Sequence, residues 1–130
     1  LYKQSGLLGL SNLSADMRTL RSNDSEAARF AIRLFTHRII RESGALSACL
    51  QGLDLYAFSG GIGEHDAILR ADVCDALGWL GLKIDPQSNQ EAIGDKAMAI
   101  HAADSSVEIW VIPTDEGRVA ARDAARLIAQ

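Results

Sequence analysis

The stretch FSGGIGEHDAILR, residues 58–70, decides the fold. It starts at the end of a short apolar run, residues 53–58, and places three glycines at positions 60, 61 and 63. An almost continuous apolar run bounded by glycines is typical of a strand buried in a sheet. Apolar residues then recur at helical spacing. The sequence therefore predicts a buried central strand, a glycine turn and a helix over about residues 64–78.

The other elements are predicted outward from this stretch. A long apolar stripe indicates a helix over about residues 25–51, and the alternation of Val107, Ile109 and Val111 indicates a strand that Pro113 ends. The remaining expectations are a loop over 1–13, a short helix capped by Ser14, weak strands at 81–85 and 96–102, a turn at 86–90 and a final helix over 114–130 capped by Thr114. Strands that alternate with helices favour an α/β fold with a largely parallel sheet.

The composition is that of one ordinary domain. The 130 residues are 48% hydrophobic and carry a formal net charge of −4, so no basic surface is available for nucleic acid. No stretch has the roughly 20 apolar residues that a membrane helix needs. Cys49 and Cys74 lie on apolar faces of predicted helices, and we expect two buried, unpaired thiols in a reducing, cytoplasmic compartment. The chain does not begin with Met and opens like the interior of a protein, so we expect a fragment.

The glycine segment allows two interpretations from its residues alone. Ligands of open α/β sheets lie beyond the carboxyl ends of strands, and glycines let the backbone approach a phosphate. The spacing matches neither of the two standard phosphate-loop fingerprints, so a phosphate-contacting loop and a purely structural turn are equally supported. Asp115 and Glu116 follow the second strong strand. They can hold Mg²⁺ or stabilise a helix dipole, and the residues alone favour the dipole.

Three segments in succession resemble the C-terminal part of acetate kinases, the acetokinase family. They are SGLLGLSNLSADMR (5–18), FSGGIGEHDAILRADVCDALGWLGLKID (58–85) and VIPTDEGRVAARDAARLI (111–128). The resemblance implies that residues 1–130 are a C-terminal nucleotide-binding segment. Its fold would be a partial ribonuclease-H-like layer with flanking helices, as in the actin, sugar-kinase and heat-shock-protein ATPase superfamily.

The resemblance also implies functional residues. In this family the matching positions contact the nucleotide: Asp16, Met17, Arg18, Gly61, Ile62, Gly63, Glu64 and His65. Many members have asparagine where this chain has His65. Glu116 corresponds to a ligand of Mg²⁺, for which Mn²⁺ is a possible substitute. The family's catalytic Arg, His and Asp groups and its acetate pocket lie upstream of the matched region, so no catalytic residue is assigned here.

The implied activity is phosphoryl transfer from ATP to acetate, giving acetyl phosphate and ADP, with this chain supplying the nucleotide and Mg²⁺ side. Kinases of propionate or butyrate share this part of the sequence, and the family implies a homodimer. A second hypothesis is a non-catalytic dimerisation module built on the stripe of helix 25–51. A third is another member of the superfamily, such as a sugar kinase.

Overall fold

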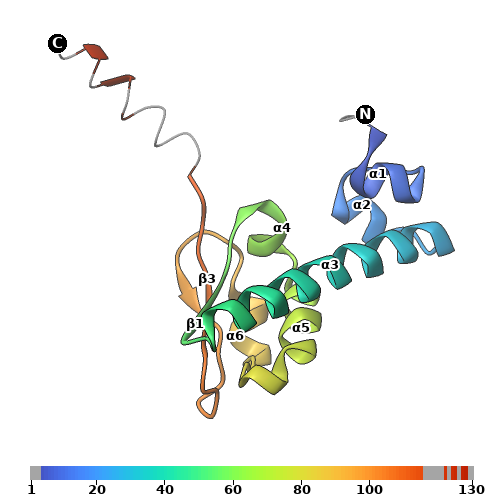
Figure 1. Cartoon of the computed structure of the whole chain (residues 1–130). Coiled ribbons are helices and arrows are strands. Elements are labelled where there is room, and N and C mark those ends of the chain that lie inside the picture. Colours follow the sequence, from blue (N-terminus) through green and yellow to red (C-terminus); the bar gives the residue numbers. More distant parts are fainter. Residues whose placement is uncertain (1–3, 116–121, 123, 126, 129–130) are drawn as a thin grey trace.

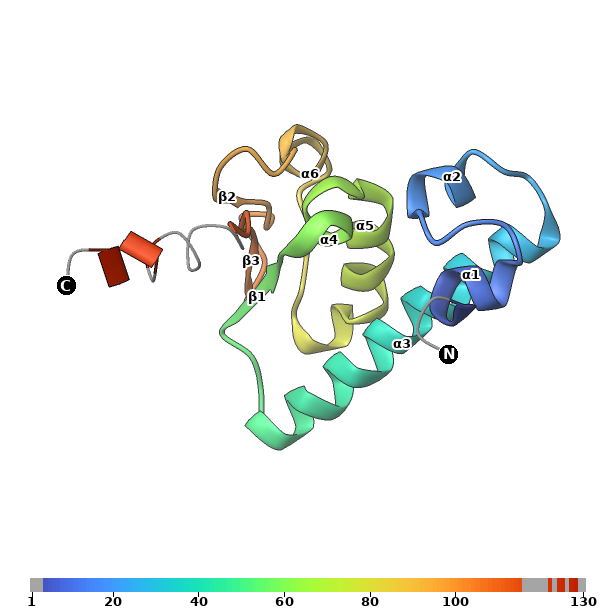
Figure 2. The ribbon, with the colours of Figure 1, turned by 90° about the horizontal axis from the view of Figure 1, so that it is seen from above.

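The computed structural model describes residues 4–115, 122, 124, 125, 127 and 128. Its helices are α1 (Gly6–Ser11), α2 (Met17–Arg21), α3 (Glu26–Leu50), α4 (Gly60–His65), α5 (Ala67–Ala76), the 3-10 helix η2 (Gly78–Leu80) and α6 (Pro86–Glu91). The strands are β1 (Leu55–Phe58), β2 (Met98–Ala99) and β3 (Glu108–Val111). Figures 1 and 2 show α3 as a long rod, with α1 and α2 beside its first half and the sheet alongside its second half.

The three strands form a mixed sheet in the order β1-β3-β2. β1 runs parallel to β3, with Tyr56 opposite Ile109, and β2 runs antiparallel to β3. The expectation that 53–58 is a central strand is therefore wrong, because β3 takes the middle position between its two partners. As an edge strand, β1 leaves 49% of Leu55 exposed. The α/β class is confirmed. The expected largely parallel sheet is not found in the described residues, where one strand pair is parallel and the other is antiparallel.

The main core lies between α5, β3 and the middle of α3. Of the predicted helical stripe, Leu69 and Val73 of α5 and Leu77 at its C-cap are buried, whereas Ala76 is exposed and Leu80 lies in η2. The three buried residues share one cluster with Ile109 and Val111 of β3, whose predicted alternation is confirmed, while residues of α3 such as Phe35 and Ile39 pack against it. This core fixes α4 and α5 against the strand that precedes them.

The long helix matches its predicted bounds within one residue. The Ser25 hydroxyl caps it by accepting a hydrogen bond from the Ala28 amide at 3.2 Å. Leu20 of α2 packs with Ala28 and Ala31 in a second, smaller cluster. The last turns of α3 are different, since Leu46 and Leu50 are 63% and 69% exposed.

Several local expectations are wrong for identifiable reasons. Residues 6–11 are helical rather than looped, because α1 packs along α3 and Leu7 joins the second cluster. The cap of the second helix is Asp16 and not Ser14. Residues 86–90 form most of α6 instead of a turn, with Asp85 capping the helix and Pro86 at its first position.

The region after β1 also differs from the predicted single helix. The glycines themselves are helical in α4, and the chain breaks at Asp66, whose carboxylate caps α5 by accepting from the Leu69 amide. Residues 81–85 contribute only an isolated bridge between Ile84 and His101. Of the predicted helix 114–130, most lies outside the described residues, but 122, 124, 125, 127 and 128 are helical.

The two cysteines have different environments. Cys74 is buried in the core, as expected, and burial raises the pKa of its thiol to about 12. Cys49 is exposed near the end of α3, so the expectation of two buried thiols is wrong. Both thiols are free. Within the described part of the chain, no helix has the length and apolar character to cross a membrane.

Candidate functional site

An open cleft of about 860 Å³ separates α2 from the α4–α5 junction. One wall is the segment 15–22, which contains α2, and the opposite wall comes from α4 and the start of α5. A single residue near the end of α6 completes the lining. The lining residues are Ala15, Asp16, Met17, Arg18, Arg21, Ser22, Gly61, Ile62, His65, Asp66, Ala67, Ile68 and Gln90.

The structure brings together most of the site residues expected from the sequence. Asp16, Met17 and Arg18 line one wall of the cleft, and Gly61, Ile62 and His65 line the other. Gly63 and Glu64 are not among the lining residues. The expected metal ligand, Glu116, lies outside the described residues.

The first wall ends in an exposed ion pair. The Asp16 carboxylate accepts hydrogen bonds from the Arg18 amide at 2.8 Å and from Arg18 Nη2 at 2.7 Å. These bonds lower the pKa of Asp16 to about 2. The Arg18 side chain is largely exposed, so it presents a cation at the mouth of the cleft.

The second wall owes its shape to glycines. Gly60 has a φ of +73°, a left-handed conformation that favours glycine as the chain leaves β1. A Cβ atom on Gly61 would meet no atom within 4 Å, so the Gly61 backbone faces open space. A Cβ atom on Gly63 would contact Phe58 at 3.4 Å, so Gly63 serves close packing against the strand. Gly61 therefore keeps the cleft open, whereas Gly60 and Gly63 shape the turn after β1.

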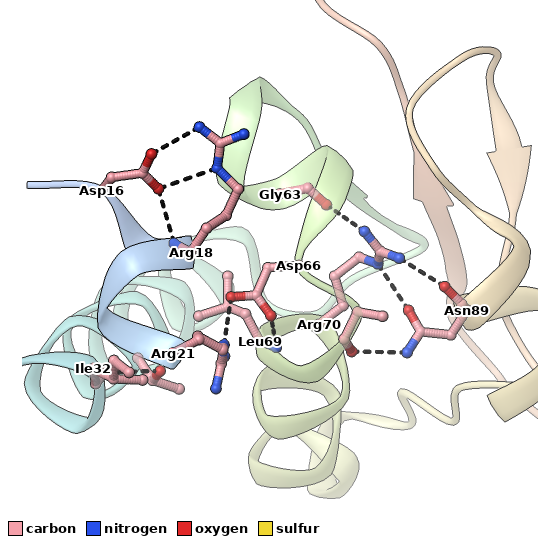
Figure 3. A network of polar contacts seen from close by, with 11 residues as sticks. Asp16, Arg18, Arg21, Ile32, Gly63, Asp66, Leu69, Arg70 and Asn89 are labelled. Carbon is pink, nitrogen blue, oxygen red and sulfur yellow. Dashed lines mark hydrogen bonds and ion pairs between the residues drawn. The ribbon is translucent and has the colours of Figure 1, made fainter. Parts of the chain in front are cut away.

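The two walls are joined directly at the base of the cleft. Arg21 Nε of α2 donates to the Asp66 carboxylate at 2.9 Å, across 45 residues of sequence. The same carboxylate caps α5, and most of both side chains is buried. Figure 3 shows Arg21 and Asp66 meeting below the exposed Asp16–Arg18 pair. The link fixes the spacing between the walls, and removal of either partner would leave the other charge largely buried and unpaired.

A buried arginine holds the second wall from behind. Arg70 is fully buried in α5 and donates to the carbonyl oxygens of Gly63 at 2.9 Å and Glu64 at 2.8 Å. It also donates to Asn89 Oδ1 and to the carbonyls of Asn89 and Ala92, at 2.7–2.9 Å. Figure 3 shows the guanidinium between Gly63 and Asn89.

The carbonyl partners explain how the charge of Arg70 is accommodated. They lie at the C-terminal ends of α4 and α6, where the helix dipoles present partial negative charge and unpaired carbonyls. Of the influences on Arg70, burial is the one that lowers its pKa from the ordinary value. A planar guanidinium can satisfy five acceptors in this fixed arrangement, whereas an ammonium has three donors on one atom.

Glu64 points away from the cleft and links two parts of the chain. Its Oε1 atom accepts from the Gly60 amide, the Thr114 amide and the Thr114 hydroxyl. These bonds, the one from the Thr114 hydroxyl above all, lower the pKa of the carboxyl. No local sequence signal predicted the pairing with Thr114, because the two residues are 50 positions apart.

The cleft suits a ligand that carries both an apolar body and negative charge. Met17, Ile62 and Ile68 supply apolar lining and the exposed Arg18 supplies a cation, while Arg21 is held by Asp66. The accessible backbone at Gly61 allows close approach. In the described ranges, no group of three or more His, Cys, Asp or Glu side chains is placed to hold a metal ion.

Comparisons with known proteins identify the family to which this sequence is similar. The sequence profile of a family described as the acetokinase family matches residues 1–122. An acetate kinase of Rhodopseudomonas palustris (strain TIE-1) is 50% identical over 127 residues, which is 98% of this chain and 31% of that protein. The chain therefore spans about a third of the length of this relative.

Solved structures of kinases also superpose on this chain. The crystal structure of Porphyromonas gingivalis acetate kinase superposes with a TM-score of 0.83 at 34% identity, over 96% of this chain and 32% of that one. A propionate kinase from Francisella tularensis subsp. tularensis SCHU S4 superposes with a TM-score of 0.74, also at 34% identity, over 87% of this chain and 29% of that one.

Proposed function

Because the chain belongs to the acetokinase family, we propose that its cleft binds ADP or ATP as part of a kinase that phosphorylates a short-chain carboxylate. The whole protein would transfer the γ-phosphoryl group of ATP to acetate, giving acetyl phosphate and ADP. This chain would supply the nucleotide and Mg²⁺ side of the reaction. Its sheet and helices would form part of a ribonuclease-H-like layer.

The observation that carries the proposal is the cleft itself. Residues 16–18 line one wall, and Gly61, Ile62 and His65 of the glycine segment line the opposite wall. Met17 and Ile62 would contact the adenine base, Arg18 would lie beside the ribose or phosphates, and the Gly61 backbone would lie against the phosphate chain. The Arg21–Asp66 bond would keep the walls at the spacing that the ligand requires.

The metal would enter with the nucleotide. Mg²⁺ in kinases takes one or two protein carboxylates and completes its shell with phosphate oxygens and water. Glu116 is the carboxylate proposed for it, and Mn²⁺ could substitute. When bound, the ion would neutralise charge on the phosphates. The segment that leads to Glu116 is held near α4 by the bonds between Thr114 and Glu64.

Calorimetric titration with ADP tests the nucleotide site. Gly61→Val adds a branched side chain where only open space exists, so the fold should persist while phosphate approach is blocked. Gly44→Val is the matched control, because Gly44 also lies within a helix with no atom near its Cβ position and is outside the cleft. We expect Gly61→Val to weaken ADP binding by about tenfold or more, corresponding to about 1.4 kcal/mol. Equal affinity in both variants would refute the site.

A chimera tests the reaction. The segment of the Rhodopseudomonas palustris relative that this chain matches would be replaced by the matching part of this chain. We expect the chimera to form acetyl phosphate from ATP and acetate, and propionate in place of acetate tests the acceptor. Loss of activity in a folded chimera that still binds ADP would show that this chain does not support the transfer step.

A second role is favoured by the exposed end of α3. Leu46, Leu50 and Leu55 are large apolar side chains exposed near the junction of α3 and β1. They would suit self-association into a homodimer or a separate interaction role. Sedimentation with and without ADP separates the possibilities: association without nucleotide binding would favour the interaction module over the kinase.

A further inference from the structure

We propose that Glu64 is a positioning residue that locks the nucleotide-facing helix α4 to the segment leaving β3. This inference rests on the proposed nucleotide site and deepens it. In place of touching the ligand, the Glu64 carboxylate would set the spacing between the glycine wall of the cleft and the segment that carries the proposed metal ligand.

The contacts of Glu64 define this link. The side chain is buried, with 7% of the residue exposed. Its Oε1 atom accepts from the amides of Gly60 and Thr114, both at 2.8 Å, and from the Thr114 hydroxyl at 2.7 Å. A buried carboxylate is costly unless donors satisfy it, and hydrogen bonds to an ionised acceptor are about twice as strong as neutral ones.

The two linked segments belong to one edge of the sheet. β1 and β3 are parallel neighbours, so the chain leaves both at the same side. Gly60 is the first residue of α4, two positions after β1, and Thr114 is three positions after β3. The Glu64 carboxylate therefore connects the exits of two neighbouring strands, where ligands of α/β sheets bind.

The rest of Glu64 is held so that it cannot turn into the cleft. Arg70 Nη1 fixes its carbonyl oxygen at 2.8 Å. Gly94, with a φ of +80°, lies so close that an added Cβ atom would be 2.9 Å from Glu64 Cβ and 3.2 Å from Oε2. Glu64 is therefore fixed by its main chain, its stem and its carboxylate, whereas its neighbours Gly61, Ile62 and His65 face the cleft.

This placement predicts a coupling between nucleotide and metal. Thr114 precedes Glu116 by two residues. Loosening the bond between Glu64 and Thr114 would leave the cleft walls intact, because Arg21–Asp66 and Arg70 still hold them. It would release the segment after β3. ADP alone should then bind almost normally, while Mg²⁺ should enhance that binding less.

The test uses Glu64→Gln, Thr114→Val and the double variant of the chain, with Glu91→Gln as the control. Glu91 lies on α6, is exposed and accepts only an exposed Gln87 amide. The first measurement is amide hydrogen exchange followed by NMR. We expect the Thr114 amide to exchange about tenfold faster in Glu64→Gln, since a charge-assisted bond is lost, and to be unchanged in Glu91→Gln. Unchanged exchange in Glu64→Gln would refute the link.

The second measurement is ADP affinity with and without Mg²⁺. We expect the enhancement by Mg²⁺ to fall about fivefold or more in Glu64→Gln and in Thr114→Val, with no further loss in the double variant, because both changes break one link. Additive losses, or an enhancement equal to that of the unchanged chain, would refute the positioning role. Failure of the unchanged chain to bind ADP would instead refute the proposed nucleotide site, while the exchange result still decides whether the link exists.

Discussion

Replacing Arg70 by methionine should be among the most destabilising single changes in this chain. The change keeps a long side chain but removes donors to five acceptors: four backbone carbonyls and Asn89 Oδ1. A buried acceptor left without a donor costs about 1–3 kcal/mol, and relaxation and water entry recover part of that sum. We expect a loss of about 4 kcal/mol in the free energy of unfolding, as for a buried hydrogen-bond network that loses all of its donors.

Thermal and urea unfolding followed by circular dichroism measure this loss. At this chain length, about 4 kcal/mol lowers the melting temperature by roughly 15 °C. Arg70→Lys should recover only part of the loss, because an ammonium keeps the charge but not the planar fork. Arg41→Met, on the exposed side of α3, is the control and should change stability by about 0.5 kcal/mol or less. If Arg70→Met has the same melting temperature as Arg41→Met, the carbonyl network does not hold the second wall.

Three further results are expected. Native chain treated with a thiol reagent at pH 8 should titrate one cysteine quickly, the exposed Cys49, and Cys74 only on unfolding, because burial raises the Cys74 pKa to about 12; two fast thiols would contradict the core packing. The Glu64 pKa is lowered in the folded chain from its ordinary value of 4.5, so its contribution to stability is complete above that value and disappears as the pH falls through the folded pKa. The stability difference between the unchanged chain and Glu64→Gln should therefore be constant near neutral pH and shrink below about pH 4.5, and a difference independent of pH would argue against an ionised Glu64. Finally, the chain alone with ATP, Mg²⁺ and acetate should give no acyl phosphate in a hydroxamate assay, since the cleft arginines Arg18 and Arg21 pair with Asp16 and Asp66 and Arg70 is buried; robust turnover would overturn the view that the catalytic groups lie elsewhere.

The elements that the sequence predicted well are those set by local periodicity. The stripe of α3 is a local signal, and so is the alternation of Val107, Ile109 and Val111. The errors lie where tertiary contacts decide. Helix α1 contains two glycines and forms because it packs on α3. Whether β1 is central or at the edge depends on which strands pair with β3, and a single strand's composition does not carry that information.

In the candidate site, too, the local segments were predicted and the tertiary contacts were not. Residues 16–18 were expected at the site from the family resemblance, and 61–65 from both the glycines and the resemblance; 16–18, Gly61, Ile62 and His65 line one cleft, whereas Gly63 and Glu64 do not. The bonds that hold the cleft were missed. Arg70 binds mainly backbone carbonyls, which leave no mark in a sequence, and Arg21 meets Asp66 across 45 residues. The bond between Glu64, which was expected to contact the nucleotide, and Thr114 was also missed, because the two residues are 50 positions apart.

The most direct test of the central claim is a titration of the isotopically labelled chain with ADP, followed by amide NMR. If the cleft binds the nucleotide, the amides of residues 16–18 on one wall and 61–65 on the other should shift together with a single dissociation constant. The amides at the far end of α3, around Leu46 and Leu50, should not move. Shifts confined to surfaces outside the cleft, or shifts at one wall without the other, would contradict the account.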